Sequence, residues 1–288
     1  MLSNARYLIP NFVTLTSLCL GVVATTLAAR GEYQHALWTA FLCTILDKFD
    51  GALARRFHAT SSFGVESDSL ADVGAFGVAP AVVVYLTVIR FSPHFSGNAH
   101  WFALAAALFY ASASALRLAK YNVIAQAGEF NQVFQGIPMP FAAGLVLAPL
   151  LLMLKYFEPA GYEPHLLDTR WVGTFSSPTS QHALFSLMVP LQLLVGYGMI
   201  SRLKVPKLTL PKVPWMKIYI SIHGFLTYFL VLTRTSPEIL NYIAFQFLFI
   251  SVYFTFKVRK DPSLTNVSML KAMGYQLELV RREDPPQG

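Results

Sequence analysis

Four aspartates in one short segment have the spacing of a metal site built on two helices. In DKFDGALARRFHATSSFGVESDSLAD, Asp47 and Asp50 are three residues apart, and Asp68 and Asp72 are four apart. Residues three or four apart share one face of a helix, so each pair predicts a face that carries two carboxylates. Carboxylates gathered without paired Cys or His select hard divalent cations. The residues therefore predict Mg²⁺ or Mn²⁺, with two ions bound between the helices.

The same acids have other interpretations. Acids inside a membrane segment also line ion or proton pathways, and acids near helix ends are common without any ligand. A cation or proton transporter and a structural cluster therefore remain alternatives to a metal-dependent enzyme. Phosphoryl transfer is favoured because two metal ions stabilise the attacking and leaving oxygens together. Glu66 lies outside the two pairs and is not expected to be a ligand.

The composition indicates a membrane protein. The chain has 288 residues, of which 55% are hydrophobic and 13% charged, whereas soluble domains carry roughly 25% charged residues. The net charge of +7 is not assigned to nucleic acid, because basic residues beside apolar segments more often set membrane topology. Cys19 and Cys43 both fall in apolar runs, so neither a disulfide framework nor a thiol metal site is predicted.

Apolar segments of about 20 residues, the length that crosses a bilayer, predict an all-α polytopic helix bundle. The eight predicted transmembrane helices cover residues 8–29, 34–57, 69–90, 100–119, 137–157, 181–200, 215–233 and 237–256. With a cytoplasmic N-terminus, the inside segments hold 17 of the 22 Lys and Arg residues, as the positive-inside rule requires. We predict a transmembrane domain over residues 1–257, a polar cytoplasmic tail over 258–288, and both termini in the cytoplasm.

The acidic segment fits D-x-x-D-G-x-x-A-R-x8-G-x3-D-x3-D at all eight defined positions. It resembles the CDP-alcohol phosphatidyltransferases, which are integral membrane enzymes of phospholipid synthesis. Four further segments resemble elements of this family, the last three those of its serine-transferring branch: PNFVTLTSLCLG (10–21), RLAKYN (117–122), FQGIPMP (134–140) and MISRLKVPK (199–207). Ser17, Lys120, Tyr121 and Val205 depart from the usual pattern, which weakens the assignment to the serine branch but not to the family.

The resemblance implies a reaction in which CDP-diacylglycerol and L-serine give phosphatidylserine and CMP. It implies that Asp47, Asp50, Asp68 and Asp72 bind the metal ions, and that Asp72 is also the general base. The residues it places at the CDP-lipid are Asn11, Thr14, Gly51, Ala54, Arg55, Ser61 and Gly64. Arg117 and Lys120 are expected to hold the serine carboxylate or the transferred phosphate, with anchoring at the membrane surface as the alternative.

The resemblance also implies a homodimer in the plasma (inner) membrane of a prokaryote. The Lys and Arg count places the aspartates, and so the active site, on the cytoplasmic side. No nucleic-acid partner is expected, because the sequence shows no basic groove interleaved with aromatic residues. The same chemistry with inositol phosphate, glycerol phosphate or choline as the acceptor is the alternative within the family. A phosphorylated acceptor favours an additional basic cluster, and none is clearly placed beyond Arg117 and Lys120.

Overall fold

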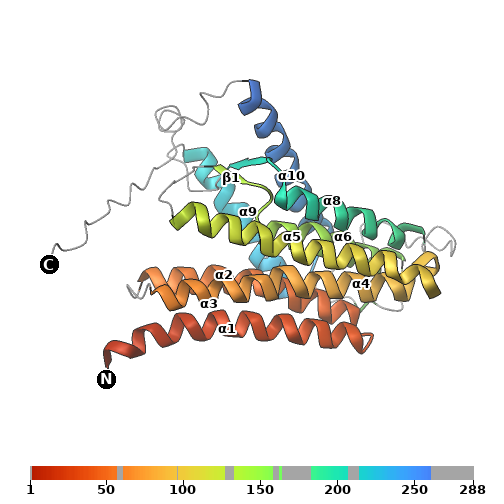
Figure 1. Ribbon diagram of the computed structural model, residues 1–288, viewed down its shortest axis with the longest axis horizontal. Helices are drawn as coiled ribbons and strands as arrows, with labels where there is room; N and C mark the ends of the chain where they lie inside the picture. The colour runs from red at the N-terminus through yellow and green to blue at the C-terminus, as the bar shows by residue number, and fades with distance from the viewer. Residues whose placement is uncertain are drawn as a thin grey trace.

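The computed structural model describes residues 2–56, 61–95, 97–126, 133–157, 162–163, 183–206 and 214–260. Long helices dominate these residues, as predicted (Figure 1). The α-helices are α1 (Leu2–Ala29), α2 (Tyr33–Arg56), α3 (Ser62–Asp72), α4 (Ala79–Phe91), α5 (His100–Gln126), α6 (Met139–Phe157), α8 (Met188–Ile200), α9 (Pro214–Thr233) and α10 (Pro237–Lys260). Two 3₁₀ turns, η2 (Pro93–Phe95) and η3 (Gly97–Ala99), connect α4 to α5.

Helices α3 and α4 form one continuous rod. The π-helical segment η1 (Val73–Val78) joins them, and the backbone stays helical at both junctions. With this rod counted once, the described residues contain eight long helical segments, the same number as predicted from apolar runs. The third begins at Ser62, seven residues before the predicted start at residue 69, because Ser61 caps α3 ahead of the apolar run.

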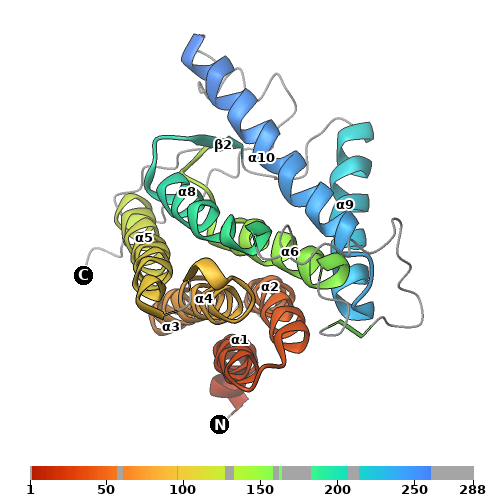
Figure 2. The same cartoon turned by 90° about the vertical axis from the view of Figure 1, so that its right-hand side faces the viewer.

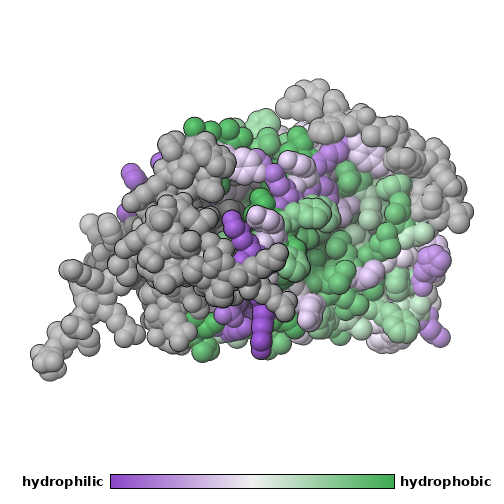
Figure 3. Space-filling view, turned by 90° about the horizontal axis from the view of Figure 1, so that it is seen from above, coloured by the Kyte–Doolittle hydropathy of each residue, from purple (hydrophilic) through white to green (hydrophobic). Residues whose placement is uncertain are grey.

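Six of these segments are long and apolar enough to cross a bilayer. They are Pro10–Ala29, Phe63–Phe91, Gly97–Ile124, Met139–Phe157, Ala183–Ile200 and Pro237–Lys257. Helix α2 falls outside this set because charged residues gather in its C-terminal half, and α9 contributes a shorter apolar stretch, Lys217–Thr233. Figure 3 shows a broad hydrophobic area on one face, as expected of a surface against lipid chains. The chain is therefore an integral membrane protein.

Close packing around small residues holds the rod in place. A Cβ added to Gly77 would overlap Ser114 Oγ of α5, and one added to Gly74 would overlap the Leu18 side chain of α1. Helices in lipid gain little from hydrophobic burial against each other, so close van der Waals contact at such positions drives their association. The rod is therefore wedged between α1 and α5, which places the aspartates of α3 at a defined height in the bundle.

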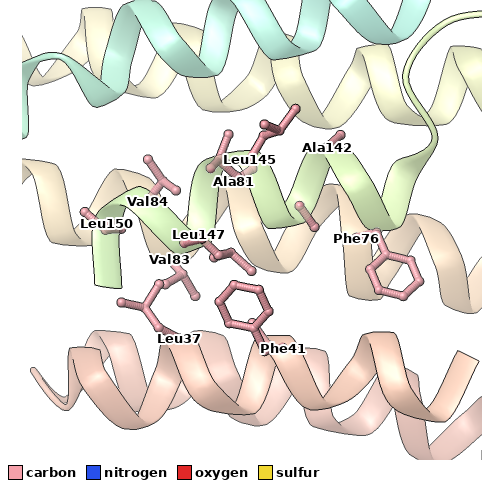
Figure 4. Packing of buried hydrophobic residues seen from close by; sticks show 14 of the residues in the cluster. Leu37, Phe41, Phe76, Ala81, Val83, Val84, Ala142, Leu145, Leu147 and Leu150 are labelled. Carbon is pink, nitrogen blue, oxygen red and sulfur yellow. The ribbon is translucent and has the colours of Figure 1, made fainter. Parts of the chain in front are cut away.

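The buried interior lies where α2, the rod and α6 meet (Figure 2). Leu37 and Phe41 of α2 point toward Val83 of α4 and Leu147 of α6 (Figure 4). Their side chains are at most 5% exposed. Close packing on one face of α2 leaves its charged C-terminal end in a fixed position beside α3.

Two short strands, not predicted from the sequence, join two of the segments that carry the family resemblance. Strand β1 (Val133–Gln135) pairs antiparallel with β2 (Lys204–Pro206). Just after β1, Gly136 has φ +79° and donates its N–H to Leu203 O at 2.8 Å. A Cβ there would overlap Met199 O, so both the backbone conformation and the close approach require glycine. The FQGIPMP and MISRLKVPK segments therefore form a single unit.

Candidate active site

The two aspartate pairs meet at one end of the bundle. The C-terminal part of α2 and all of α3 lie side by side at the left in Figure 1, where α5 also ends. Carboxylate oxygens of Asp47, Asp50 and Asp68 lie within 4.8 Å of one another. The carboxyl of Asp72 lies close enough to that of Asp47 for the two groups to interact. Asp47, Asp50 and Asp68 thus converge in the structure, with Asp72 near Asp47.

The start of α3 is held by its own cap and by α1. Ser61 Oγ accepts a hydrogen bond from Gly64 N at 3.0 Å, the geometry of an N-cap. A Cβ on Gly64 would lie 3.1 Å from Ser61 Oγ and 3.3 Å from Asn11 Oδ1. A side chain at position 64 would therefore press against both oxygens, where α1 approaches this turn closely. Three predicted CDP-lipid residues from two helices are brought together here.

Asp50 is the most firmly held carboxylate of the group. Its side chain is 6% exposed. Thr14 Oγ1 of α1 donates to Asp50 Oδ2 at 2.9 Å, and Gly51 N donates to Asp50 Oδ1 at 2.6 Å. Each oxygen keeps a second lone pair for a cation. Thr14 and Gly51, both predicted to contact the CDP-lipid, thus contact a predicted metal ligand.

Two described cations, Lys48 and Arg117, lie near the cluster. Lys48 Nζ is 4.0 Å from Asp47 Oδ2, but the lysine side chain is 65% exposed, and such surface pairs contribute little. Arg117 of α5 is buried and close enough to Asp72 for the two charges to interact. Lys120, one turn later, is exposed. Of the two residues predicted to bind the acceptor, Arg117 is therefore buried and Lys120 is exposed.

Two contacts near the site were not predicted. Asn122 Nδ2 of α5 donates to Ser69 Oγ of α3 at 3.0 Å, which ties α5 to the helix that carries Asp68. Tyr228 of α9 lies close enough to Asp47 for an electrostatic interaction. Asn122 falls within the RLAKYN segment and could have been singled out. Tyr228 sits in an ordinary apolar helix that carries no motif.

Two predicted residues lie partly outside what the structure describes. The backbone of Ala54 and Arg55 belongs to the last turns of α2, but their side chains are not among the described ones. Glu66, on α3, is exposed.

The carboxylates fit a bound divalent cation. Three oxygens within 4.8 Å of one another, from two helices, form the all-oxygen donor set that Mg²⁺ and Mn²⁺ prefer. Thr14 and Gly51 orient one of these ligands, as the outer contacts of a metal site do. Like charges this close are costly unless a cation lies between them.

The chain belongs to the CDP-alcohol phosphatidyltransferase family. The model of that family matches residues 7–180, which include all four aspartates, Thr14 and Arg117. The chain is 31% identical over 264 residues to the CDP-diacylglycerol–serine O-phosphatidyltransferase of Helicobacter pylori, a match that covers 90% of this chain and 98% of that protein.

Proteins of the same name from other organisms match shorter stretches. The one from Mycobacterium leprae is 35% identical over 153 residues, 52% of this chain and 48% of that protein. The one from Methanocaldococcus jannaschii is 32% identical over 148 residues, 51% of this chain and 63% of that protein.

Proposed function

We propose that this protein transfers the phosphatidyl group of CDP-diacylglycerol to the hydroxyl of L-serine, producing phosphatidylserine and CMP. The observation that carries the proposal is the convergence of Asp47, Asp50 and Asp68, with Asp72 beside them. The match along nearly the whole length of a serine-transferring relative supports serine as the acceptor.

The reaction needs a base and an electrophilic phosphorus. The serine hydroxyl oxygen attacks the phosphorus that carries the diacylglycerol. The new P–O bond forms as the bond from phosphorus to the bridging oxygen of CMP breaks. Asp72 takes the hydroxyl proton, and CMP leaves with the electron pair. A positioned base of this kind contributes about 10²–10⁴-fold to the rate.

The four aspartates are proposed to hold two ions of Mg²⁺ or Mn²⁺. When bound, such ions polarise the phosphate and stabilise the charge that develops on the leaving oxygen. Asp47 and Asp50 present their oxygens from α2, and Asp68 and Asp72 from α3. Since the helices are held by close packing, the ligand positions are set before the substrate arrives.

The CDP-lipid is proposed to lie against the ends of α1, α2 and α3. Asn11, Ser61 and Gly64 form one polar corner there, and Gly51 and Ala54 are small residue types near the end of α2, which suits close approach of a nucleotide. Arg55, from the same turn, provides a guanidinium suited to phosphate oxygens. Thr14 borders this region through its contact with Asp50.

Arg117 is proposed as the principal cation for the acceptor. It is buried, unlike Lys120, and lies near Asp72. A guanidinium here suits the serine carboxylate or the transferred phosphate, because it offers two parallel N–H donors. Lys120, being exposed, is assigned the weaker role of attracting the anionic substrates.

The remaining proposals concern topology and assembly. We infer eight membrane-spanning helices within residues 1–257, a cytoplasmic polar tail over 258–288 and both termini in the cytoplasm. Residues 261–288 lie outside the described part of the chain. The aspartates then face the cytoplasmic side of the plasma (inner) membrane of a prokaryote, where a lipid-linked nucleotide meets a water-soluble alcohol. A homodimer embedded in membrane lipid is proposed from the family.

The decisive experiment measures CMP release by the purified protein in detergent or vesicles. CDP-diacylglycerol and Mn²⁺ or Mg²⁺ are supplied with each acceptor in turn: serine, glycerol phosphate, inositol phosphate and choline. Release with serine and formation of phosphatidylserine are expected. Release with a different acceptor only would overturn the assignment of serine. A lack of release with every acceptor, together with cation flux into liposomes, would support a transporter instead.

A further inference from the structure

Thr14 makes a hydrogen bond that its predicted role at the nucleotide does not require. Its side chain is 5% exposed, and its hydroxyl is 2.9 Å from Asp50 Oδ2, across the interface between α1 and α2. A hydroxyl buried between two helices next to a carboxylate serves that carboxylate first, because the acceptor is charged and has little access to water. The geometry points to Thr14 as a positioning residue for Asp50.

The conformation of Thr14 is set by its own helix. Its hydroxyl also lies 3.2 Å from Pro10 O, four residues earlier. Threonine in a helix adopts a rotamer that lets its hydroxyl approach that carbonyl. The same rotamer brings the hydroxyl to Asp50, and its single proton goes to the closer and charged acceptor. Because threonine is β-branched and has few rotamers in a helix, orienting the Thr14 hydroxyl toward Asp50 costs little side-chain entropy.

This contact leaves Asp50 with both oxygens held. Oδ1 accepts from Gly51 N and Oδ2 accepts from Thr14. Two donors, from different helices, restrict the orientation of the carboxylate, and carboxylate oxygens of Asp47 and Asp68 lie within 4.8 Å of it. We propose that Thr14 holds Asp50 in the orientation that binds a divalent cation. That a cation binds here rests on the proposed function. The hydrogen bond between Thr14 and Asp50 does not depend on which alcohol accepts the phosphatidyl group.

The test compares Thr14→Val with Thr14→Ser. Valine keeps the shape and removes the hydroxyl, and serine keeps the hydroxyl. Binding of Mn²⁺ to the purified protein, without substrate, is followed by the loss of the free-ion signal in electron paramagnetic resonance. Loss of an outer contact typically weakens metal binding about 10–100-fold. Valine is expected to show such a loss, and serine to stay within about threefold of the wild type.

Thr16→Val is the matched control, because the Thr16 hydroxyl bonds only the Phe12 carbonyl of its own helix, at 2.7 Å, among the contacts of the described residues. It should leave Mn²⁺ binding unchanged. Helical circular dichroism and metal-free thermal unfolding verify that each variant folds. A second control uses Asp50→Asn: if Thr14 acts through Asp50, the valine change adds little in that background.

Normal Mn²⁺ binding by folded Thr14→Val would overturn the proposal. If that variant instead shows only a raised KM for the CDP-lipid, Thr14 contacts the nucleotide directly. Because the readout needs no turnover, a wild-type protein that binds Mn²⁺ but releases no CMP would refute the proposed function and leave the role of Thr14 intact.

Discussion

Two groups of charged side chains in this bundle differ in the signs of the charges that they bring together. At one end, Asp47, Asp50, Asp68 and Asp72 gather charges of one sign. At the other, Lys155 of α6 lies 2.9 Å from Glu238 of α10, with side chains 0% and 12% exposed. Tyr156 donates a further hydrogen bond to Glu238. One group is a direct ion pair, whereas in the other the described side chains bring four carboxylates together near Lys48 and Arg117.

The two groups are well separated. Gln34 at the start of α2 exchanges hydrogen bonds of 2.7 and 2.6 Å with the backbone of Glu163, shortly after α6 ends. The C-terminal end of α6 therefore lies beside the beginning of α2. Asp47 lies 13 residues further along α2, which is about 20 Å at 1.5 Å per residue.

The difference separates structural charge from functional charge. In the ion pair, the charges of Lys155 and Glu238 neutralise each other and link α6 to α10. Asn241 of α10 adds a second link, a hydrogen bond of 2.7 Å to Ala148 O of α6. Ionised aspartates this close repel one another, and a bound divalent cation would relieve that repulsion. Such a cluster could hold a metal ion. Each prediction below tests one side of this contrast.

The largest effect is expected from Asp72→Asn. The amide cannot accept the serine proton, so turnover should fall by about 10²–10⁴-fold. Removal of one negative charge relieves repulsion with Asp47, so the free energy of unfolding without metal should stay the same or rise. CMP release and denaturant unfolding measure the two quantities. Turnover within tenfold of the wild type would remove Asp72 as the base.

The ion pair should behave in the reverse way. Lys155→Met leaves Glu238 buried without its cation, and should destabilise the protein by about 3–5 kcal/mol. The double variant Lys155→Met with Glu238→Gln should recover most of that loss, because neither side chain is then charged. Unfolding in detergent measures both. Mn²⁺ affinity of folded protein should not change in either variant.

Lys48→Met provides a matched control, since Lys48 also faces a carboxylate but is 65% exposed. Its removal should cost no more than about 1 kcal/mol. If the single Lys155→Met variant were as stable as this control, the group would not be the structural pair described here.

A smaller effect is expected from packing on the rod that carries Asp68 and Asp72. Gly77→Ala places a methyl group where it overlaps Ser114 Oγ, and overpacking of this kind costs about 1–3 kcal/mol. Adding Ser114→Gly removes the obstacle and should restore most of the stability. Thermal unfolding measures the change. If the double variant were no more stable than Gly77→Ala alone, contact with α5 would not be the reason for glycine.

The sequence predicted the aspartate site better than the contrast between the two groups. Fixed spacing was enough to put Asp47 with Asp50, and Asp68 with Asp72, on one face of a helix each, and in the structure Asp47, Asp50 and Asp68 lie together. Lys155 and Glu238 are 83 residues apart, and nothing local shows that they meet. For the same reason the pairing of β1 with β2 and the approach of Tyr228 to Asp47 were not foreseen. Apolar runs revealed the helices but not their partners.

The smallest effect is expected from Glu66→Gln. Glu66 lies on the same helix as Asp68 and Asp72, but its side chain is exposed. Exposed substitutions usually change stability by no more than about 0.5 kcal/mol, which corresponds to roughly a twofold change in an equilibrium. Turnover and Mn²⁺ affinity should both stay within that range, although the change removes a full negative charge from α3. A loss of Mn²⁺ affinity above tenfold would mean that charge near the site matters more than the geometry of the four aspartates, and the contrast between a ligand-binding cluster and its exposed neighbour would fail.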